Sequence, residues 1–410
     1  MSFSRVRGVR DLLELETQKI QQILGTFQLI TRKAGYHQIT LPSLEESSLY
    51  TKSLGDYSDI VTKEMFYIQN KSYVLRPEGT AGAIRSYLMN CLLGEKKLWS
   101  YCGSMFRHEK PQNQRYREFY QYGIESISNS FTPASDAEVI ILAADILTHL
   151  NVPSVLHINT LGDEQARKDY NVLLGEYFQG KTLSKLSENR KQAQKFLRIL
   201  DSKEEEDQQA ISSAPSIIDC LGQREKDYFD EVKIILEKFK IPFLHNPRLV
   251  RGLDYYSNVC FEFINTKALI GGGRYDNLAG MVGKEKNMGG IGWAAGIDRI
   301  CELVQLNEKQ KIVGIVPVGS NCVEQCMHVA RKIRMESEFI VKMKTEGNSV
   351  KQHLGYLKNY EPTFIIFIGE EEINSGCLKL KICATAEHVF VPIKEVFDHP
   401  AVTLSKFLLN

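Results

Sequence analysis

The stretch MFRHEKPQNQRYREFYQYGIES, residues 105–126, constrains the fold of this chain more than any other segment. Apolar and aromatic residues on both sides of the polar loop HEKPQNQR predict two strands paired in an antiparallel sheet. Alternate side chains of a strand share one face. On the second strand, one face carries Arg115, Arg117, Phe119, Gln121, Gly123 and Glu125. Such a face indicates a binding surface, and an exposed hairpin with ordinary salt bridges is the alternative.

The same stretch contains a donor suited to phosphate. Arg107 stands just before the turn and adds a further guanidinium. Its planar fork of N–H groups matches phosphate oxygens in pairs. The binding surface is therefore predicted to accept an anionic ligand.

The flanking elements favour a sheet packed against helices. An amphipathic helix over 12–34 is predicted to end at Gly35, and a strand about Ile39 and Leu41 to end at Pro42. Further predicted elements are two short strands within 64–76, a helix over 135–150, strands at 257–264 and near 269, and a helix over about 295–305.

Two changes along the chain indicate its domains. Residues 163–240 are charged and mainly helical, and their most polar run, KEEEDQQ at 203–209, is predicted to be a solvated helix face or loop. LNEKQK at 306–311 is predicted to be a linker. Strands and helices alternate beyond it, which is typical of a compact α/β domain. We therefore expect a first domain over 1–308, with a helical insertion at about 163–240, and a second over 312–410.

Composition excludes several classes of protein. The chain has 51 Lys+Arg and 50 Asp+Glu, so any nucleic acid must be held by local patches of charge. The 9 Cys include no C-x-x-C pair, which favours free thiols in a cytoplasmic compartment over disulfides or a zinc site. Neither a membrane span nor a signal peptide is predicted from the apolar runs.

Two further segments combine tight turns with polar side chains. LRPEGTAGAIRSYL at 75–88 is a strand entering a helix, where Glu78 and Thr80 suit either helix capping or ligand binding. LVRGLDYYSN at 249–258 places Arg251 and two tyrosines in one loop, which is either a site or a surface turn.

The glycine-rich segments are weak signals when taken alone. GGGRYDNL at 271–278 fits neither dinucleotide-binding nor P-loop spacing. GGIGWAAGIDRI at 289–300 leads into a helix bearing Arg299, and a single helix arginine is usually a surface charge.

Taken together in their order along the chain, however, five stretches resemble sequence motifs of the histidyl-tRNA synthetase family. This family belongs to the class II aminoacyl-tRNA synthetases. They are YHQITLPSLE for the first class II motif, LRPEGTAG for the histidine-binding turn, MFRHE…RYREFYQ for the second motif, LVRGLDYY for the family's own signature, and GGIGWAAGIDRI for the third motif. The resemblance covers essentially the whole chain.

This resemblance implies both a fold and a reaction. The fold is a class II antiparallel sheet with flanking helices, a helical insertion and a C-terminal α/β anticodon-binding domain. The reaction joins histidine and ATP as histidyl-adenylate, then transfers histidine to the terminal adenosine of its tRNA. Mg²⁺ accompanies the ATP phosphates, the chain forms a homodimer, and no metal site among its own side chains is implied.

The resemblance also implies roles for individual residues. The catalytic pair is Arg107 and Arg251. The ATP contacts are Arg107, Glu109, Arg115, Phe119 and Arg299. The histidine contacts are Glu78, Thr80, Gln121, Glu125, Arg251, Tyr255 and Tyr256. Gln112 and Arg117 are candidates for the tRNA acceptor end.

Two other functions are possible for a chain of this kind. One is a regulatory paralog of the synthetase that binds histidine without charging tRNA. The other is an accessory protein on a class II fold. The intact arginines and the last 100 or so residues favour the enzyme.

Overall fold

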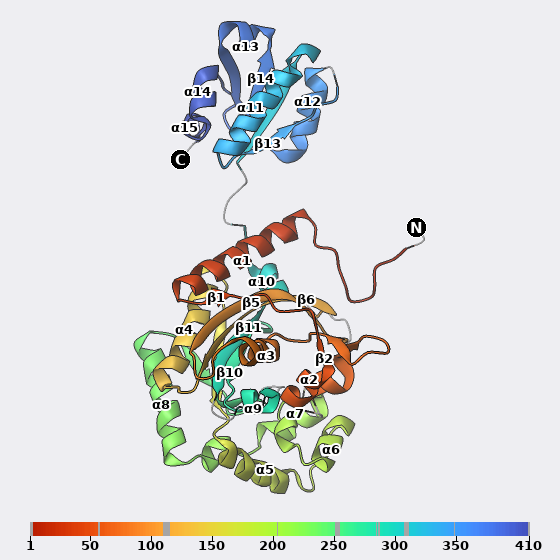
Figure 1. Cartoon of the computed structure of the whole chain (residues 1–410), viewed down its shortest axis with the longest axis vertical. Coiled ribbons are helices and arrows are strands. Elements are labelled where there is room, and N and C mark those ends of the chain that lie inside the picture. The colour runs from red at the N-terminus through yellow and green to blue at the C-terminus, as the bar shows by residue number, and fades with distance from the viewer. Residues whose placement is uncertain are drawn as a thin grey trace. The chain divides into compact units, whose positions relative to one another are not determined.

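Two compact units make up the chain, Met1–Leu306 and Asn307–Asn410, each with its own hydrophobic core (Figure 1). The computed structural model describes residues 3–55, 58–109, 115–202, 204–250, 255–283, 285, 288–306, 311–347 and 349–408. Most of the predicted linker, residues 307–310, lies outside the described residues.

The first unit is built on a sheet of eight strands. Their spatial order is β1 (His37–Gln38), β5 (Lys97–Phe106), β6 (Glu118–Ser128), β11 (Gly289–Gly296), β10 (Ala268–Arg274), β9 (Ser257–Ile264), β7 (Val155–Thr160) and β8 (Phe243–His245). The terminal pairs β1–β5 and β7–β8 are parallel, and the other neighbours are antiparallel. The predicted class II antiparallel sheet with flanking helices is confirmed.

Helices cover both faces of this sheet. They are α1 (Glu14–Lys33), α2 (Ser47–Leu54), α3 (Thr80–Asn90), α4 (Pro133–His149), α8 (Gln223–Lys238), α9 (Leu278–Gly283) and α10 (Ile297–Leu303). Figure 1 shows α1 outside the curved sheet and α3 within its curve. The core under α1 contains Phe27, Tyr122 and Trp293, and the Phe27 ring lies 5.0 Å from that of Tyr122 and 5.9 Å from that of Trp293. Even-numbered residues of β6 therefore face this core, which leaves its odd-numbered residues for the other face.

The strand predicted about Ile39 and Leu41 is wrong in extent. Pairing with β5 stops after β1, and the chain then enters a three-stranded sheet of β2 (Leu44–Glu46), β4 (Tyr73–Leu75) and β3 (Phe66–Tyr67). The buried guanidinium of Arg76 donates to the carbonyl of Leu41 at 2.7 Å and to that of Ser104 at 2.9 Å. A side chain thus replaces the strand ladder at Leu41.

The region 163–240 contains α5 (Glu164–Phe178), α6 (Lys185–Gln192) and α7 (Glu205–Ser212), followed by α8. The run at 203–209 is not wholly solvated as predicted, because Asp207 is fully buried. Its carboxylate accepts hydrogen bonds from the hydroxyls of Ser184 (2.8 Å), Ser187 (2.5 Å) and Ser202 (2.5 Å). These donors stabilise a buried carboxylate that the local sequence does not distinguish from its exposed neighbours.

The second unit is a five-stranded α/β fold. Its strands lie in the order β13 (Ile340–Met343), β12 (Ile312–Val318), β14 (Phe364–Gly369), β15 (Cys377–Ile382) and β16 (His388–Pro392). Its helices are α11 (Val323–Glu336), α12 (Val350–Leu357), α13 (Glu370–Ser375), α14 (Ile393–Asp398) and α15 (Pro400–Ser405). The single last helix that the sequence predicts is two helices, and Pro400 begins the second.

Across the described part of the chain, no helix has both the length and the apolar character required to cross a membrane. All nine cysteines have free thiols.

Candidate active site

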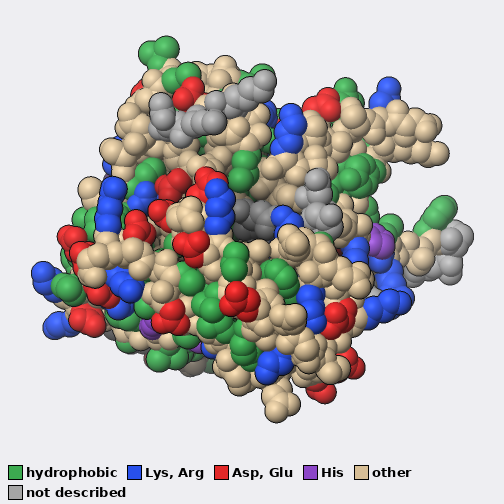
Figure 2. All heavy atoms as spheres, turned by 90° about the horizontal axis from the view of Figure 1, so that it is seen from below, with side chains coloured by type: hydrophobic (Ala, Val, Ile, Leu, Met, Phe, Trp, Pro, Cys, Tyr) green, Lys and Arg blue, Asp and Glu red, His purple; other side chains and the backbone are tan. Residues whose placement is uncertain are grey.

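A cavity of about 990 Å³ lies in the first unit, against the sheet face that carries the odd-numbered residues of β6. Ten of the residues named from the sequence line it, namely Glu78, Thr80, Arg107, Glu109, Arg115, Phe119, Gln121, Tyr255, Tyr256 and Arg299. Residues of the helical region, including Arg190 and Ser202, complete the wall. Figure 2 shows one face of the molecule, on which acidic and basic side chains lie close together.

Glu125 does not line the cavity itself but lies behind Thr80, which does, and is buried in a cluster of hydroxyl groups. One carboxylate oxygen accepts from the hydroxyls of Thr80 at 2.7 Å and Tyr101 at 3.1 Å. The other accepts from the hydroxyl of Tyr275 at 2.5 Å. Glu125 is only 1% exposed, so the carboxylate is satisfied by three hydroxyls rather than by water.

Glycines provide the space for this cluster. A Cβ atom at Gly123 would lie 2.3 Å from the ring of Tyr101, and one at Gly79 would lie 2.2 Å from it. A Cβ at Gly292 would meet the Glu125 carboxylate at 2.1 Å. The glycines in three separate motifs are thus required because side chains of the site occupy the volume of a methyl group.

The environment also changes the protonation of the cluster. Burial above all, together with the charge of the neighbouring Glu78, raises the pKa of Glu125 to about 8, against the opposing effect of the hydrogen bonds from the hydroxyls. Burial also raises the pKa of Tyr275 well above its usual range. At neutral pH the cluster therefore holds a proton that can be shared with a polar ligand.

Glu78 performs the capping role that the sequence left open. Its carboxylate accepts from the backbone N–H of Thr80 at 2.7 Å and from that of Ala81 at 2.9 Å, at the start of α3. Burial raises its pKa, while these backbone hydrogen bonds oppose the rise. Glu78 also lines the cavity, so capping fixes a carboxylate in the wall where a cationic ligand group can reach it.

Gln121 provides an acceptor that the protein does not use. Its Oε1 atom is buried and has no hydrogen-bond partner among the residues that the structure describes. Because a buried acceptor without a partner is costly, its position on the cavity wall indicates a donor on the ligand.

Tyr255 and Tyr256 are packed together, with ring centroids 4.6 Å apart, and Tyr255 lies 5.9 Å from Tyr275. The backbone carbonyl of Tyr256 accepts from the guanidinium of Arg167 at 2.7 Å, so helix α5 supports this loop. Arg251, which precedes them in the same motif, lies outside the described residues.

The cationic end of the cavity is the part lined by Arg107, Arg115 and Arg299. Burial lowers the pKa of Arg299, and the charges of Arg115 and Arg107 lower it further. Arg299 donates to the carbonyl of Ala268 at 2.6 Å, and Arg107 donates to that of Pro77 at 2.9 Å. These two guanidiniums, each held by a main-chain carbonyl, and that of Arg115 repel one another, and a polyanion would relieve that repulsion.

The remaining polar side chains border this cationic end. Arg115 forms an ion pair with Glu109 at 3.6 Å, and the guanidinium of Arg107 lies 5.4 Å from the ring of Phe119. The exposed part of that ring is a surface on which a planar group can stack.

The two acceptor-end candidates are placed differently. Arg117 donates to the carbonyls of Glu109 at 3.4 Å and Arg7 at 3.2 Å, which ties the N-terminal segment to β6. Gln112 lies outside the described residues.

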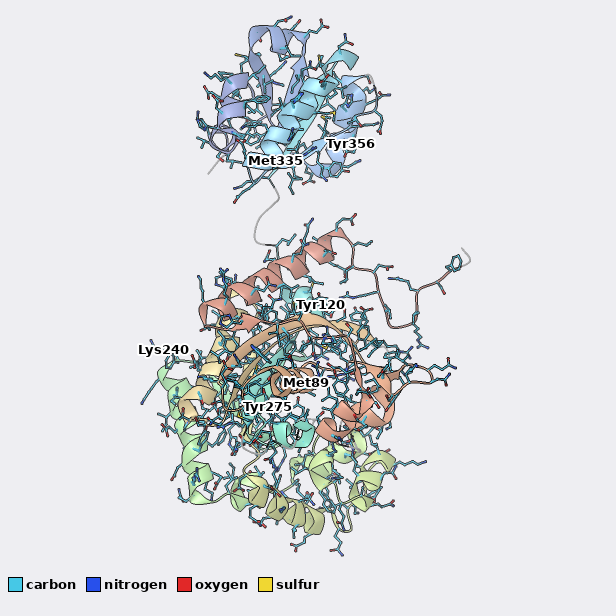
Figure 3. The ribbon with its side chains drawn as sticks, in the orientation of Figure 1. Met89, Tyr120, Lys240, Tyr275, Met335 and Tyr356 are labelled. Atoms are coloured by element: carbon cyan, nitrogen blue, oxygen red, sulfur yellow. The ribbon has the colours of Figure 1, made fainter. Side chains whose placement is uncertain are left out.

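Sequence reasoning missed two residues of the site, Tyr101 and Tyr275. Both are buried, and Figure 3 marks Tyr275 within the first unit. The sequence contains a partial signal for Tyr275, because this residue lies in the glycine-rich segment GGGRYDNL. That segment alone is only a weak indication of a binding site. Tyr101 gave no local signal, since an aromatic residue in a strand is usually part of the core.

Among the residues that the structure describes, no group of three or more His, Cys, Asp or Glu side chains could hold a metal ion.

Comparisons with known proteins agree with this geometry. Residues 8–300 match the family model described as histidyl-tRNA synthetase, and residues 312–399 match the anticodon binding domain. Histidine–tRNA ligase of Streptococcus thermophilus (strain ATCC BAA-491 / LMD-9) is 34% identical, with 99% of each chain covered. That of Geobacillus sp. (strain WCH70) is 33% identical, with 99% of this chain and 100% of its own covered.

Solved structures give the same result. Apo histidyl-tRNA synthetase of S. aureus aligns with a TM-score of 0.78 at 26% identity, over 97% of this chain and 99% of its own. The fold and the cavity define a class II aminoacyl-tRNA synthetase. More narrowly, the chain belongs to the histidyl-tRNA synthetase family, as the sequence motifs predict.

Proposed function

We propose that this chain activates histidine with ATP and transfers it to the 3′-terminal adenosine of its tRNA. One observation carries the proposal, namely a single cavity that Thr80 separates from a buried carboxylate–phenol cluster at one end and that three guanidiniums line at another. An amino acid with a polar ring suits the first end, and a nucleoside triphosphate suits the second. The family membership supports the same pairing.

The histidine would lie at the end formed by Glu125 and Tyr256, with Tyr255 beside them. A neutral imidazole has one donor and one acceptor nitrogen, so a protonated carboxyl and a phenol can satisfy both. The α-amino group would approach Glu78 and the unpartnered Oε1 of Gln121. Thr80 donates to Glu125, so it would act by orienting the carboxyl.

The ATP would lie toward the guanidiniums. Phe119 would stack on the adenine and Glu109 would contact its edge, while Arg115 and Arg299 would bind the outer phosphates. We propose that ATP enters with Mg²⁺ bound to its phosphates, as a substrate complex.

The chemical step places negative charge on the α-phosphate. The histidine carboxylate attacks the α-phosphorus, the bond to the β-phosphate oxygen breaks, and pyrophosphate leaves. Arg107 would stabilise the pentacovalent centre, and Arg251 would bridge that phosphate and the carboxylate. A preorganised donor of this kind contributes about 3–4 kcal/mol to a transition state.

Transfer to tRNA would complete the reaction. A hydroxyl of the terminal ribose attacks the carbonyl of the adenylate, and AMP leaves. Gln112 and Arg117 are the candidates for contact with the acceptor end, and the second unit would bind the anticodon.

We further propose a cytoplasmic homodimer. Free thiols at all nine cysteines are consistent with a reducing compartment. Leu44, in the first class II motif, and Tyr73, on the strand β4 paired with it, are exposed apolar side chains. Sedimentation at several concentrations would test this assembly, and a monomer at micromolar concentration would contradict it.

ATP–pyrophosphate exchange with each of the twenty amino acids in turn tests the function. Exchange with histidine alone is expected. Histidine binding without exchange would instead favour a regulatory paralog. That alternative is not favoured by the full-length matches to histidine–tRNA ligases.

A further inference from the structure

The N-terminal segment of residues 7–10 is bound to the first unit beside the active site, although it lies outside the five motifs. The carbonyl of Gly8 accepts from the backbone N–H of Arg117 at 2.7 Å, and that of Arg7 accepts from the guanidinium of Arg117 at 3.2 Å. Strand β6 begins at the next residue, Glu118. We call residues 7–10 the N-terminal strap, since they are held against the start of β6.

Arg10 is the residue of this strap that contacts the site. Its Nη2 atom donates to Oδ1 of Asp298 at 2.6 Å, and its Nη1 atom donates to Glu16 on α1 at 3.0 Å. Its guanidinium also lies 4.2 Å from the centre of the Tyr116 ring. The side chains of Arg10 and Asp298 are 20% and 8% exposed, so this ion pair is largely removed from water. Loss of one partner would therefore leave the other as a poorly solvated charge.

Asp298 joins the elements that carry two of the class II motifs. Its Oδ2 atom accepts from the backbone N–H of Tyr120 on β6 at 2.7 Å, and Figure 3 labels Tyr120. Asp298 itself lies in α10, directly before Arg299. One carboxylate thus connects the strand that follows Arg115 to the helix that carries Arg299. Arg10 binds the remaining oxygen of that carboxylate.

The charge of Asp298 also borders the ligand space. Asp298 lines the same cavity as the three guanidiniums of the cationic end, and Arg10 lies behind it, outside the described lining. Burial by itself lowers the pKa of Arg10, but the hydrogen bond to Asp298 and the charge of that carboxylate raise it above its ordinary value. Arg10 is therefore a permanent cation. It offsets a negative charge that would otherwise weaken the attraction of the cavity for a polyanion.

We propose that Arg10 is a positioning residue for the triphosphate of ATP, acting through Asp298. It neutralises the carboxylate of Asp298 and holds α10 against β6, so that Arg115 and Arg299 keep the spacing that the outer phosphates require. This inference rests on the proposed function, because that function supplies ATP to the cavity. Within the described residues, the contacts of Arg10 do not extend to the cluster around Glu125, so its effect is confined to ATP.

A purely structural role for Arg10 predicts a different result. Arg10 also binds Glu16 near the start of α1, and loss of this contact alone would loosen the helix. A loosened helix would lower the stability of the unit and weaken both substrates alike. Loss of the neutralising charge beside the cationic end would instead weaken ATP and leave histidine unchanged.

The test begins with two substitutions of Arg10 and one control in the same segment. Arg10→Met keeps a long side chain on the Tyr116 ring and removes the charge, whereas Arg10→Lys keeps the charge. The control is Arg5→Met, because Arg5 pairs with Asp11 at 3.6 Å on the surface, where the two side chains are 62% and 71% exposed. An exposed pair of this kind contributes little to stability.

A double variant separates charge from packing. Arg10→Met combined with Asp298→Asn removes both charges, and the asparagine oxygen still accepts the N–H of Tyr120. If the unpaired carboxylate is what repels ATP, the double variant should bind ATP more tightly than Arg10→Met alone. If Arg10 acts only by packing, the second substitution brings no recovery.

The readouts are the KM for ATP and the KM for histidine in ATP–pyrophosphate exchange, with the Kd of ATP from calorimetry. Arg10→Met is expected to raise both ATP constants about tenfold and to change the KM for histidine less than about twofold. Arg10→Lys should stay within about threefold of the wild type, because it retains the cation. Arg5→Met should match the wild type.

Three results would overturn the proposal: unchanged ATP constants in Arg10→Met, equal increases in the constants for ATP and histidine, or no recovery in the double variant. Thermal unfolding checks that each variant is folded. Arg10→Gln, which keeps a donor for Asp298 without the charge, replaces Arg10→Met if that variant does not fold.

The outcome is separable from that of the proposed function. A wild-type protein that binds ATP without any exchange would contradict the function, and the Kd of ATP would still test the role of Arg10, since calorimetry needs no turnover. Exchange by the wild type with equal ATP constants in Arg10→Met would contradict the role of Arg10 alone.

Discussion

At the scale of single residues, the site is defined by one carboxyl group kept away from water. Glu125 is 1% exposed, and its pKa is raised to about 8, chiefly by burial. An unfolded glutamate titrates near pKa 4.3, so the folded state binds the extra proton between these two values. Stability that depends on this proton is present at low pH and is lost as the pH rises through 8.

Glu125→Gln removes this titration while keeping an acceptor and adding a donor. Above pH 8 the variant is expected to be more stable than the wild type by on the order of a few kcal/mol, and the difference should shrink toward pH 5. Thermal unfolding of both proteins from pH 5 to pH 9 measures the effect. A stability difference between the two proteins that stays the same from pH 5 to pH 9 would contradict the raised pKa of Glu125.

The hydroxyl of Tyr275 is the second prediction at this scale. Tyr275→Phe leaves one oxygen of Glu125 without its donor at 2.5 Å, which should raise the KM for histidine about tenfold and change kcat less. Steady-state exchange kinetics separate the two constants. Tyr73→Phe, at a tyrosine 42% exposed on β4, is the control and should behave as the wild type. A lower kcat with an unchanged KM would place Tyr275 elsewhere in the reaction.

At the scale of elements, glycines determine how closely strands and rings approach. Tyr101 on β5 lies against Gly123 on β6 and Gly79 before α3, so three segments meet at one phenol. The carboxylate of Glu125 on β6 thereby accepts hydrogen bonds from the hydroxyls of Thr80, at the start of α3, and of Tyr101 on β5.

Gly123→Ala is expected to destabilise the protein by about 1–3 kcal/mol, because a methyl group would lie 2.3 Å from the Tyr101 ring. Histidine binding should weaken with it. Gly25→Ala on α1 is the control, since its Cβ would have no described atom within 4 Å apart from its own and neighbouring residues of the helix, and it should be neutral or slightly stabilising. Chemical denaturation measures the free energy of unfolding of both variants. If the two substitutions change it equally, the close approach of Gly123 to Tyr101 does not determine stability.

At the scale of the whole molecule, the chain divides into two units. The described residues that line the cavity all belong to Met1–Leu306, and residues 312–399, which match the anticodon binding domain, belong to Asn307–Asn410. We expect a chain that ends at residue 306 to unfold cooperatively and to retain histidine-dependent exchange, while aminoacylation falls at least about a hundredfold through lost tRNA affinity. Calorimetry and the two assays measure this. Loss of exchange in a folded fragment would show that the second unit is needed for activation.

The sequence alone predicted the antiparallel β5–β6 pair, the shared face of Phe119, Gln121 and Glu125, and the α/β pattern after residue 311. These features depend on periods of two and 3.6 residues and on turn residues, which are local properties. The motifs also named ten residues that line one cavity. Their proposed roles remain predictions.

Only the tertiary structure decided how distant residues combine. It brought Tyr101 and Tyr275 onto Glu125, buried Asp207 among three serines, and paired the carbonyl of Leu41 with the guanidinium of Arg76. None of these follows from a local pattern, because burial and hydrogen bonding of a side chain depend on segments far away in the chain. The local sequence does not distinguish a tyrosine or an aspartate that is hydrated by water from one that is buried and bonded to other side chains.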